Sequence, residues 1–118
     1  MATHKYRDLI VWQKSMDLVT IVYQITLNFP DIERYGLISQ MRRCAISIPS
    51  NIAEGSRRGS KKDFRKFVLI SFGSGAELET QLEISLNLRY TSKAEIDECT
   101  KLLDEIMKML NKLQTTLK

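Results

Sequence analysis

The middle of the chain has the sequence Ser47-Ile-Pro-Ser-Asn-Ile-Ala-Glu-Gly-Ser-Arg-Arg-Gly-Ser-Lys-Lys-Asp-Phe-Arg-Lys-Phe67. Apolar residues at helical spacing lie on both sides of it, so the stretch contains the end of one helix, a loop and the beginning of the next. We expect Gly55 to end the first of these helices as a left-handed cap. Ser60, three residues before Asp63, is a good N-cap for the second.

Working outward, the apolar spacing predicts helices at about 9–28, 37–54, 60–89 and 92–117. Pro30 should stop the first, because the residue before a proline is pushed out of the α region. The fourth opens with the capping box Ser92-Lys-Ala-Glu95. No run alternates apolar and polar residues as a strand would. The sequence therefore predicts a single all-α domain over residues 1–118, an antiparallel up-down-up-down four-helix bundle.

The same spacing identifies the side chains that should face the core. In the first helix they form one seam, Val11, Leu18, Val22, Ile25 and Phe29, and a second seam, Trp12, Met16, Val19 and Tyr23. In the second and third helices they are Ile38, Met41, Ala45, Ile48, Ile52, Phe64, Val68, Phe72, Leu78, Leu82 and Leu86. In the fourth they form a coiled-coil-like seam, Ile96, Cys99, Leu103, Ile106, Leu110, Leu113 and Leu117, with Leu102 and Met109 beside it. This is more apolar surface than one bundle requires, which indicates self-association.

Two places should depart from a regular helix. Pro49 lacks an N–H and clashes with the carbonyl of residue 45, so we expect a kink there, with Ser47 and Ser50 placed to bond the freed backbone groups. The segment 71–76 is rich in small residues, which indicates close approach of a neighbouring backbone or a local bend.

The composition is that of an ordinary globular protein, with 43% hydrophobic residues. Cys44 and Cys99 lie at apolar helical positions without metal-ligand spacing, so we expect buried free thiols in a reducing cytosol. The polar N-terminus lacks the apolar core of a signal peptide, and no segment is apolar for long enough to span a membrane. The sequence thus predicts a cytoplasmic protein without a membrane partner.

The chain lacks the residues that catalysis would require, so we expect no enzyme, no metal and no cofactor. Nucleophilic catalysis by Ser or Cys needs a positioned histidine base, and the single histidine, His4, lies in the polar N-terminal segment. Glu77 and Glu79 should point about 200° apart on a helix and cannot share a metal. Glu79 and Glu83 could face one way, but a carboxylate pair in solvent or at an interface is favoured over a metal site.

Positive charge is concentrated in one region. The net charge of the chain is +4, but residues 42–66 hold eight cations and two carboxylates, a net charge of +6, which leaves −2 for the rest. Phosphate backbones are the natural partner of such a cluster, and an ordinary solvated helix end is the alternative. The candidate phosphate contacts are Arg57, Arg58, Lys61, Lys62, Arg65 and Lys66, with Arg42 and Arg43 in second place. Lys62 and Lys66 are one helical turn apart, as are Lys61 and Arg65, and also Arg58 and Lys62 if the helix starts early.

Several stretches resemble a known family. They are Arg7-Asp-Leu-Ile-Val-Trp-Gln13, Tyr23-Gln-Ile-Thr26, Phe29-Pro-Asp-Ile-Glu33, Tyr35-Gly-Leu37, Ser39-Gln-Met-Arg-Arg-Cys-Ala-Ile-Ser-Ile-Pro-Ser-Asn-Ile-Ala-Glu-Gly55 and Gly73-Ser-Gly-Ala-Glu-Leu-Glu-Thr80. Over roughly residues 6–90 the chain is similar to the bacterial four-helix-bundle proteins encoded by intervening sequences in 23S ribosomal RNA genes. The accessory variability determinant of diversity-generating retroelements belongs to the same family. The resemblance implies an antiparallel bundle, a barrel-like homopentamer, a basic surface suspected of binding nucleic acid, and no catalytic residues.

Two functions follow as hypotheses. The first is a non-enzymatic oligomeric scaffold that binds RNA or DNA backbone without strong sequence specificity, since symmetry multiplies a modest charge into avidity. The second is a protein–protein adaptor, for example for a reverse transcriptase, with nucleic-acid binding incidental or absent.

Overall fold

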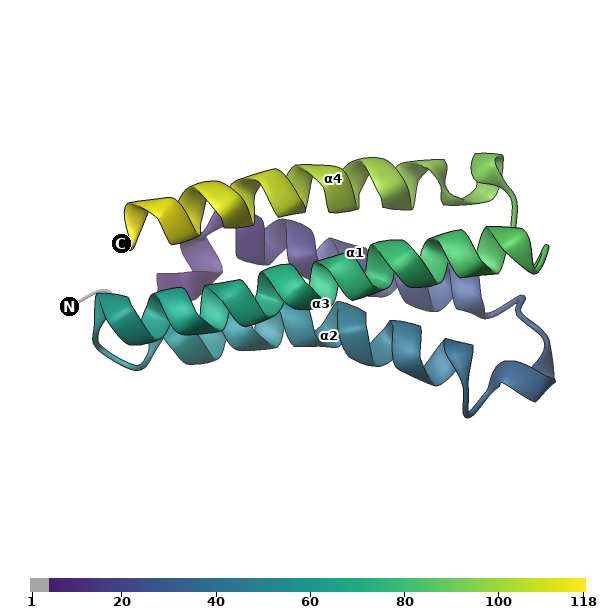
Figure 1. Cartoon of the computed structure of the whole chain (residues 1–118), viewed down its shortest axis with the longest axis horizontal. Coiled ribbons are helices and arrows are strands. Elements are labelled where there is room, and N and C mark those ends of the chain that lie inside the picture. The colour runs from purple at the N-terminus through teal and green to yellow at the C-terminus, as the bar shows by residue number, and fades with distance from the viewer. Residues whose placement is uncertain (1–4) are drawn as a thin grey trace.

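The computed structural model describes residues 5–118, so His4 lies outside the described residues. The predicted all-α class with four helices is confirmed, and residues 5–118 contain no strand. Figure 1 shows the helices lying side by side along the long axis of the molecule, which measures 46 × 24 × 20 Å. The elements are η1 (Lys5–Asp8), α1 (Ile10–Thr26), η2 (Asp31–Glu33), α2 (Leu37–Ser56), α3 (Lys61–Asn87) and α4 (Lys93–Thr116).

Side chains cap two of the helices as predicted. The Ser60 hydroxyl accepts a hydrogen bond from the backbone N–H of Asp63 at 3.1 Å at the start of α3. At the start of α4 the Ser92 hydroxyl accepts from the N–H of Glu95 at 3.2 Å and donates to the Glu95 carboxylate at 3.1 Å. Both serines satisfy N–H groups that lack an intrahelical partner, so these boundaries are determined locally.

The expected left-handed cap at Gly55 is wrong. α2 continues through Gly55 to Ser56, and the glycine with positive φ is Gly59, at +89°. A Cβ atom at Gly55 would lie only 2.6 Å from Cβ of Phe67. The lack of a side chain at Gly55 therefore lets the end of α2 approach α3 closely, and the turn takes its left-handed residue four positions later.

Each helix packs against two others, and the buried side chains lie between them. α2 packs most extensively against α3, and the further contacts are α1 with α2, α3 with α4, and α1 with α4. The predicted seam of α4 is buried from Ile96 to Leu110 and half-buried at Leu113 and Leu117. Cys99 is buried as expected, whereas Cys44 is only half-buried.

Small polar side chains line the contact between α2 and α3. The Ser71 hydroxyl donates to the backbone carbonyl of Ile48 at 2.8 Å, and the Ser47 and Ser74 hydroxyls lie 2.8 Å apart. Ser71 and Ser74 thus show the close approach predicted for the segment 71–76, whereas Gly73 has no neighbouring atom within 4 Å and the alternative of a local bend stays a prediction. The group that Pro49 deprives of a donor is the carbonyl of Ala45, not that of Ile48, so the kink at Pro49 and the bonds expected from Ser47 and Ser50 stay predictions.

The second apolar seam of α1 is only partly covered. Trp12 and Val19 are half-buried against the core, while Met16 and Tyr23 are 45% and 38% exposed. Large apolar side chains that are exposed to this extent suit a protein–protein interface, but self-association stays a prediction.

Candidate nucleic-acid interface

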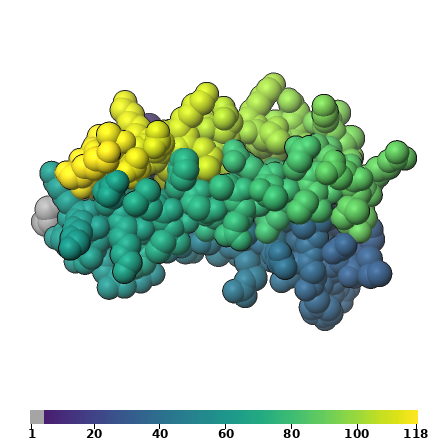
Figure 2. Space-filling view, viewed as in Figure 1, coloured from purple at the N-terminus to yellow at the C-terminus, as the bar shows by residue number. Residues whose placement is uncertain are grey.

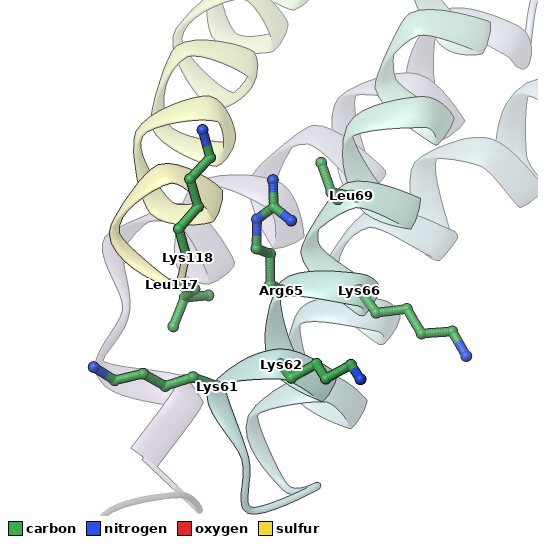
Figure 3. Close-up of a pocket in the computed structure, with 7 residues that line it drawn as sticks. All are labelled: Lys61, Lys62, Arg65, Lys66, Leu69, Leu117 and Lys118. Carbon is green, nitrogen blue, oxygen red and sulfur yellow. The ribbon is translucent and has the colours of Figure 1, made fainter.

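The first turns of α3 bring four cations together beside the end of α4 (Figure 3). A groove of about 630 Å³ lies there, lined by Lys61, Lys62, Arg65, Lys66, Leu69, Leu117 and Lys118. Since α3 begins at Lys61, the pairs Lys61–Arg65 and Lys62–Lys66 each lie one turn apart on the helix. Figure 2 shows the C-terminal residues lying against the first turns of α3 at the same end of the molecule.

The cationic side chains spread over this end in different directions. In Figure 3, Lys62 and Lys66 point to one side, and Lys61 extends to the other, toward the ribbon of the N-terminal segment. All three lysines are exposed, so their ammonium groups are available to a ligand. Arg65 is half-buried and rises between α3 and α4.

Hydrogen bonds hold Arg65 to α4. Its Nε donates to the backbone carbonyl of Gln114 at 3.1 Å, and its Nη2 donates to Oε1 of the same residue at 2.9 Å. Gln114 is uncharged, so these bonds orient the guanidinium without neutralising it. Arg65 thus adds charge to the groove while joining two helices.

Among residues 5–118, no carboxylate forms an ion pair with the four cations of α3. The ion pairs found in residues 5–118 join Lys14 to Glu105, Arg58 to Glu54, Lys101 to Asp97, and Lys108 to Asp104. The positive end of the α3 dipole lies at the same place and adds to the field. The groove therefore offers several unneutralised positive charges to an anion.

The two arginines of the preceding loop are partly engaged. The Arg58 guanidinium lies 2.9 Å from the Glu54 carboxylate and 4.9 Å from the ring centre of Phe67. Arg58 would lie one helical turn from Lys62 only if the helix started early, and α3 begins at Lys61, so Arg58 lies before the helix. Arg57 is exposed, and its guanidinium lies 5.7 Å from the ring centre of Tyr6.

Arg42 and Arg43 do not line the groove. Arg42 donates from Nε to the hydroxyl of Thr26 at 2.9 Å, and its guanidinium lies 4.3 Å over the ring of Tyr23. Arg42 therefore joins α2 to α1. Arg43 is exposed on α2.

Sequence reasoning missed several residues at this end of the molecule. Leu69, Leu117 and Lys118 line the groove, but they come from one turn farther along α3 and from the end of the chain. The spacing of Leu69 from Arg65, one helical turn, was the available local signal. Tyr6 contacts Arg57, which is 51 positions later in the chain, so no local sequence pattern predicts this contact.

Neither cysteine thiol of the described residues is activated as a nucleophile. Burial raises the pKa of Cys99 to about 12, and burial also raises the pKa of Cys44, so both thiols stay protonated near neutral pH. Between residues 5 and 118, no three His, Cys, Asp or Glu side chains gather as a metal site would require. In the same range no helix has the length and apolar character needed to cross a bilayer.

Comparison with known proteins agrees with the fold. A crystal structure of a protein of unknown function from the S23 ribosomal protein family of Bacteroides thetaiotaomicron superposes with a TM-score of 0.79 at 23% identity, covering 89% of this chain and 98% of that one. No curated protein matches the chain. The sequence pattern of the 23S rRNA-intervening sequence protein family matches residues 7–112. This match covers most of the sequence, and the chain therefore belongs to the 23S rRNA-intervening sequence protein family.

Proposed function

We propose that this protein is a non-enzymatic scaffold that binds the backbone of RNA or DNA through the basic groove, without strong sequence specificity. One observation carries the proposal: Lys61, Lys62 and Lys66 are exposed beside Arg65, and no ion pair in the described part of the chain neutralises any of them. Lysines on flexible stems act as point charges toward phosphate, which suits positioning on a backbone rather than base readout. The family is named for intervening sequences of 23S rRNA, so RNA is the first ligand to test.

The proposal includes the arrangement of the chain and its assembly. We place the four helices in an antiparallel up-down-up-down bundle, supported by the short connections and by the ring of neighbouring helix contacts. We also propose a homo-oligomer, a pentamer by resemblance, acting in the cytoplasm. Repetition of the groove around a symmetry axis would convert weak contacts into avidity.

A salt series tests the function directly. Fluorescence anisotropy of a labelled structured RNA and of a duplex DNA is measured at increasing salt concentrations. The expected result is binding to both ligands with a steep loss of affinity as salt increases, because each neutralised phosphate releases counterions. Absence of binding at low salt would overturn the proposal and leave the cluster as a solvated helix end.

The adaptor function stays a second candidate because apolar side chains outside the groove are exposed. Ile32 in η2 and Tyr35 just after it are 87% and 90% exposed, α3 exposes Ile70 and Ile84, and Leu88 is exposed just after α3. Such side chains suit a protein partner, for example a reverse transcriptase. Capture of that partner by a protein whose basic groove has been neutralised would favour this function over the first.

A further inference from the structure

A second groove lies on the molecule between η1, α1 and α2. Its volume is about 330 Å³, near the lower end of the roughly 300–1,000 Å³ typical of small-ligand pockets. Its walls are mainly apolar. Tyr6 of η1 and Trp12 of α1 supply aromatic rings, and Met16, Ile46 and Pro49 are among the other lining residues. None of the side chains just named carries a charge, so the groove suits a flat, weakly polar ligand.

The two aromatic rings in this groove form one cluster. The ring centres of Tyr6 and Trp12 lie 5.3 Å apart in an edge-to-face arrangement at 66°. Both side chains are only half-buried, so part of each ring is open to a ligand. Stacking of a base on aromatic rings tolerates any sequence, because every base has a π face.

The guanidinium groups of two arginines lie over these rings. The Arg7 guanidinium is 5.7 Å from the ring centres of both Tyr6 and Trp12, and the Arg57 guanidinium is 5.7 Å from that of Tyr6. Both arginines are exposed, and the ion pairs found across the described chain include neither. An aromatic slot flanked by guanidinium groups complements a nucleotide, whose base is flat and whose phosphate is anionic.

The basic groove lies next to this site along the chain. Arg57 follows the last residue of α2, and Lys61 begins α3 only four residues later. A backbone that contacts the lysines of α3 can thus continue to Arg57 at the edge of the aromatic groove.

We propose that the groove formed by Tyr6 and Trp12 binds one unpaired base of a single-stranded nucleic acid, with Arg7 and Arg57 holding the adjacent phosphates. This inference rests on the proposed function, and it adds a preference for single-stranded over fully paired ligands. A base held in a duplex is already stacked on its neighbours, so it cannot enter the groove unless it leaves the stack.

The chain carries its own probe, because Trp12 is the single tryptophan of the sequence. A short oligothymidylate is titrated while Trp12 fluorescence and the anisotropy of a label on the oligonucleotide are followed together. An abasic oligonucleotide of equal length, which has the phosphates but no bases, and a duplex serve as comparison ligands. The expected result is quenching of Trp12 by oligothymidylate alone, with anisotropy reporting binding of all three.

Variants of the groove sharpen this test. Tyr6→Leu keeps an apolar side chain but removes the ring, and should weaken oligothymidylate binding about fivefold or more while leaving the abasic ligand unaffected. Tyr6→Phe keeps the ring and should bind as the natural protein does. Ser50→Glu places a carboxylate at an exposed position of the same groove without removing any packing, and should weaken oligothymidylate binding even if Tyr6→Leu perturbs the fold.

The outcomes separate the two proposals. Binding without quenching, together with unchanged affinity in Tyr6→Leu and Ser50→Glu, would overturn the stacking site and leave the backbone-binding function intact. Failure of all three ligands to bind at low salt would overturn both. A change in Trp12 fluorescence that depends on protein concentration alone would mean that a second copy of the chain covers the groove, and would also overturn the stacking site.

Discussion

The Arg65 guanidinium donates hydrogen bonds to two atoms of Gln114, the backbone carbonyl at 3.1 Å and the side-chain Oε1 at 2.9 Å. These residues are 49 positions apart and connect the beginning of α3 to the end of α4. Because both bonds hold one rigid planar group, Arg65 is a structural residue as well as a charge. No side-chain hydrogen bond or ion pair found in residues 5–118 involves its neighbours Lys61, Lys62 and Lys66. The basic cluster therefore contains one cation that joins two helices and three that are exposed without such a bond.

Replacing Arg65 should therefore lower stability, whereas replacing its neighbour should not. For Arg65→Ala we expect a decrease of about 1–2 kcal/mol in the free energy of unfolding, because hydrogen bonds from a charged donor are lost. For Lys66→Ala, at an exposed position on the same helix, we expect a change within about 0.5 kcal/mol. Urea unfolding followed by circular dichroism measures both values, and equal stabilities would contradict the assigned role of Arg65.

Charge reversal at the exposed lysines should weaken nucleic-acid binding for all sequences alike. In Lys62→Glu combined with Lys66→Glu, the slope of log affinity against log salt should decrease in magnitude by about 2, one unit for each lost phosphate contact. The matched control is Arg34→Glu combined with Lys93→Glu, which changes the net charge equally at two exposed positions outside the groove. Anisotropy titrations that give the same slope for both variants would mean that the groove is not the contact surface.

The same substitution should have opposite effects at two helical glycines. A methyl group at Gly55 would meet the Cβ atom of Phe67 at 2.6 Å, and neither backbone can move away easily, so Gly55→Ala should cost about 1–3 kcal/mol. A methyl group at Gly73 would meet no atom within 4 Å beyond its chain neighbours and the local helix backbone, so Gly73→Ala should gain about 0.5–1 kcal/mol through helix propensity. Thermal or urea unfolding measures the sign of the stability change in each variant. A stabilising Gly55→Ala would disprove the close approach of α2 and α3.

Acid should weaken the contact made by Glu33. Its carboxylate accepts from the N–H of Leu37 at 3.0 Å and from the Tyr90 hydroxyl at 2.9 Å, and these bonds, the backbone one first, lower the pKa of Glu33 from its ordinary 4.5. A lowered pKa in the folded state stabilises the protein above the unfolded value, and this stability is lost as pH decreases through the folded value.

The variant Glu33→Gln, which cannot titrate at this position, isolates that effect. Between about pH 5 and about pH 3 the urea midpoint of the natural protein should decrease more than that of the variant, because only the carboxylate gains a proton. Parallel pH profiles for the two proteins would show that Glu33 contributes nothing to acid sensitivity.

The two thiols should differ in reactivity with a disulfide reagent. Cys99 is fully buried and its pKa is raised to about 12, by burial first and by Glu98 second, so it should react only as the protein unfolds. Cys44 is half-buried with a raised pKa, and should react slowly in the folded protein. Ellman titration with and without urea, repeated on Cys44→Ser, distinguishes them. Equal rates in the absence of urea would contradict the burial of Cys99.

Local patterns were sufficient to predict the helices. Apolar residues recur with the helical period because one face of each helix is buried, and Ser60 and Ser92 cap their helices through N–H groups only three residues away. The location of the basic cluster was likewise visible, since most of its members are close neighbours in the chain. Gly55 was misassigned because a glycine at a helix end is compatible with both a left-handed cap and a close helix contact.

The sequence by itself determined the class of the fold, the helix boundaries to within a few residues and the concentration of charge in one segment. Only the tertiary structure decided what each cation does: Arg65 bonds α4, Arg42 bonds α1, and Arg57 lies beside Tyr6. The reason is the range of the interactions. Helical period and capping act over a few residues, whereas these contacts depend on how whole helices are rotated and spaced against one another.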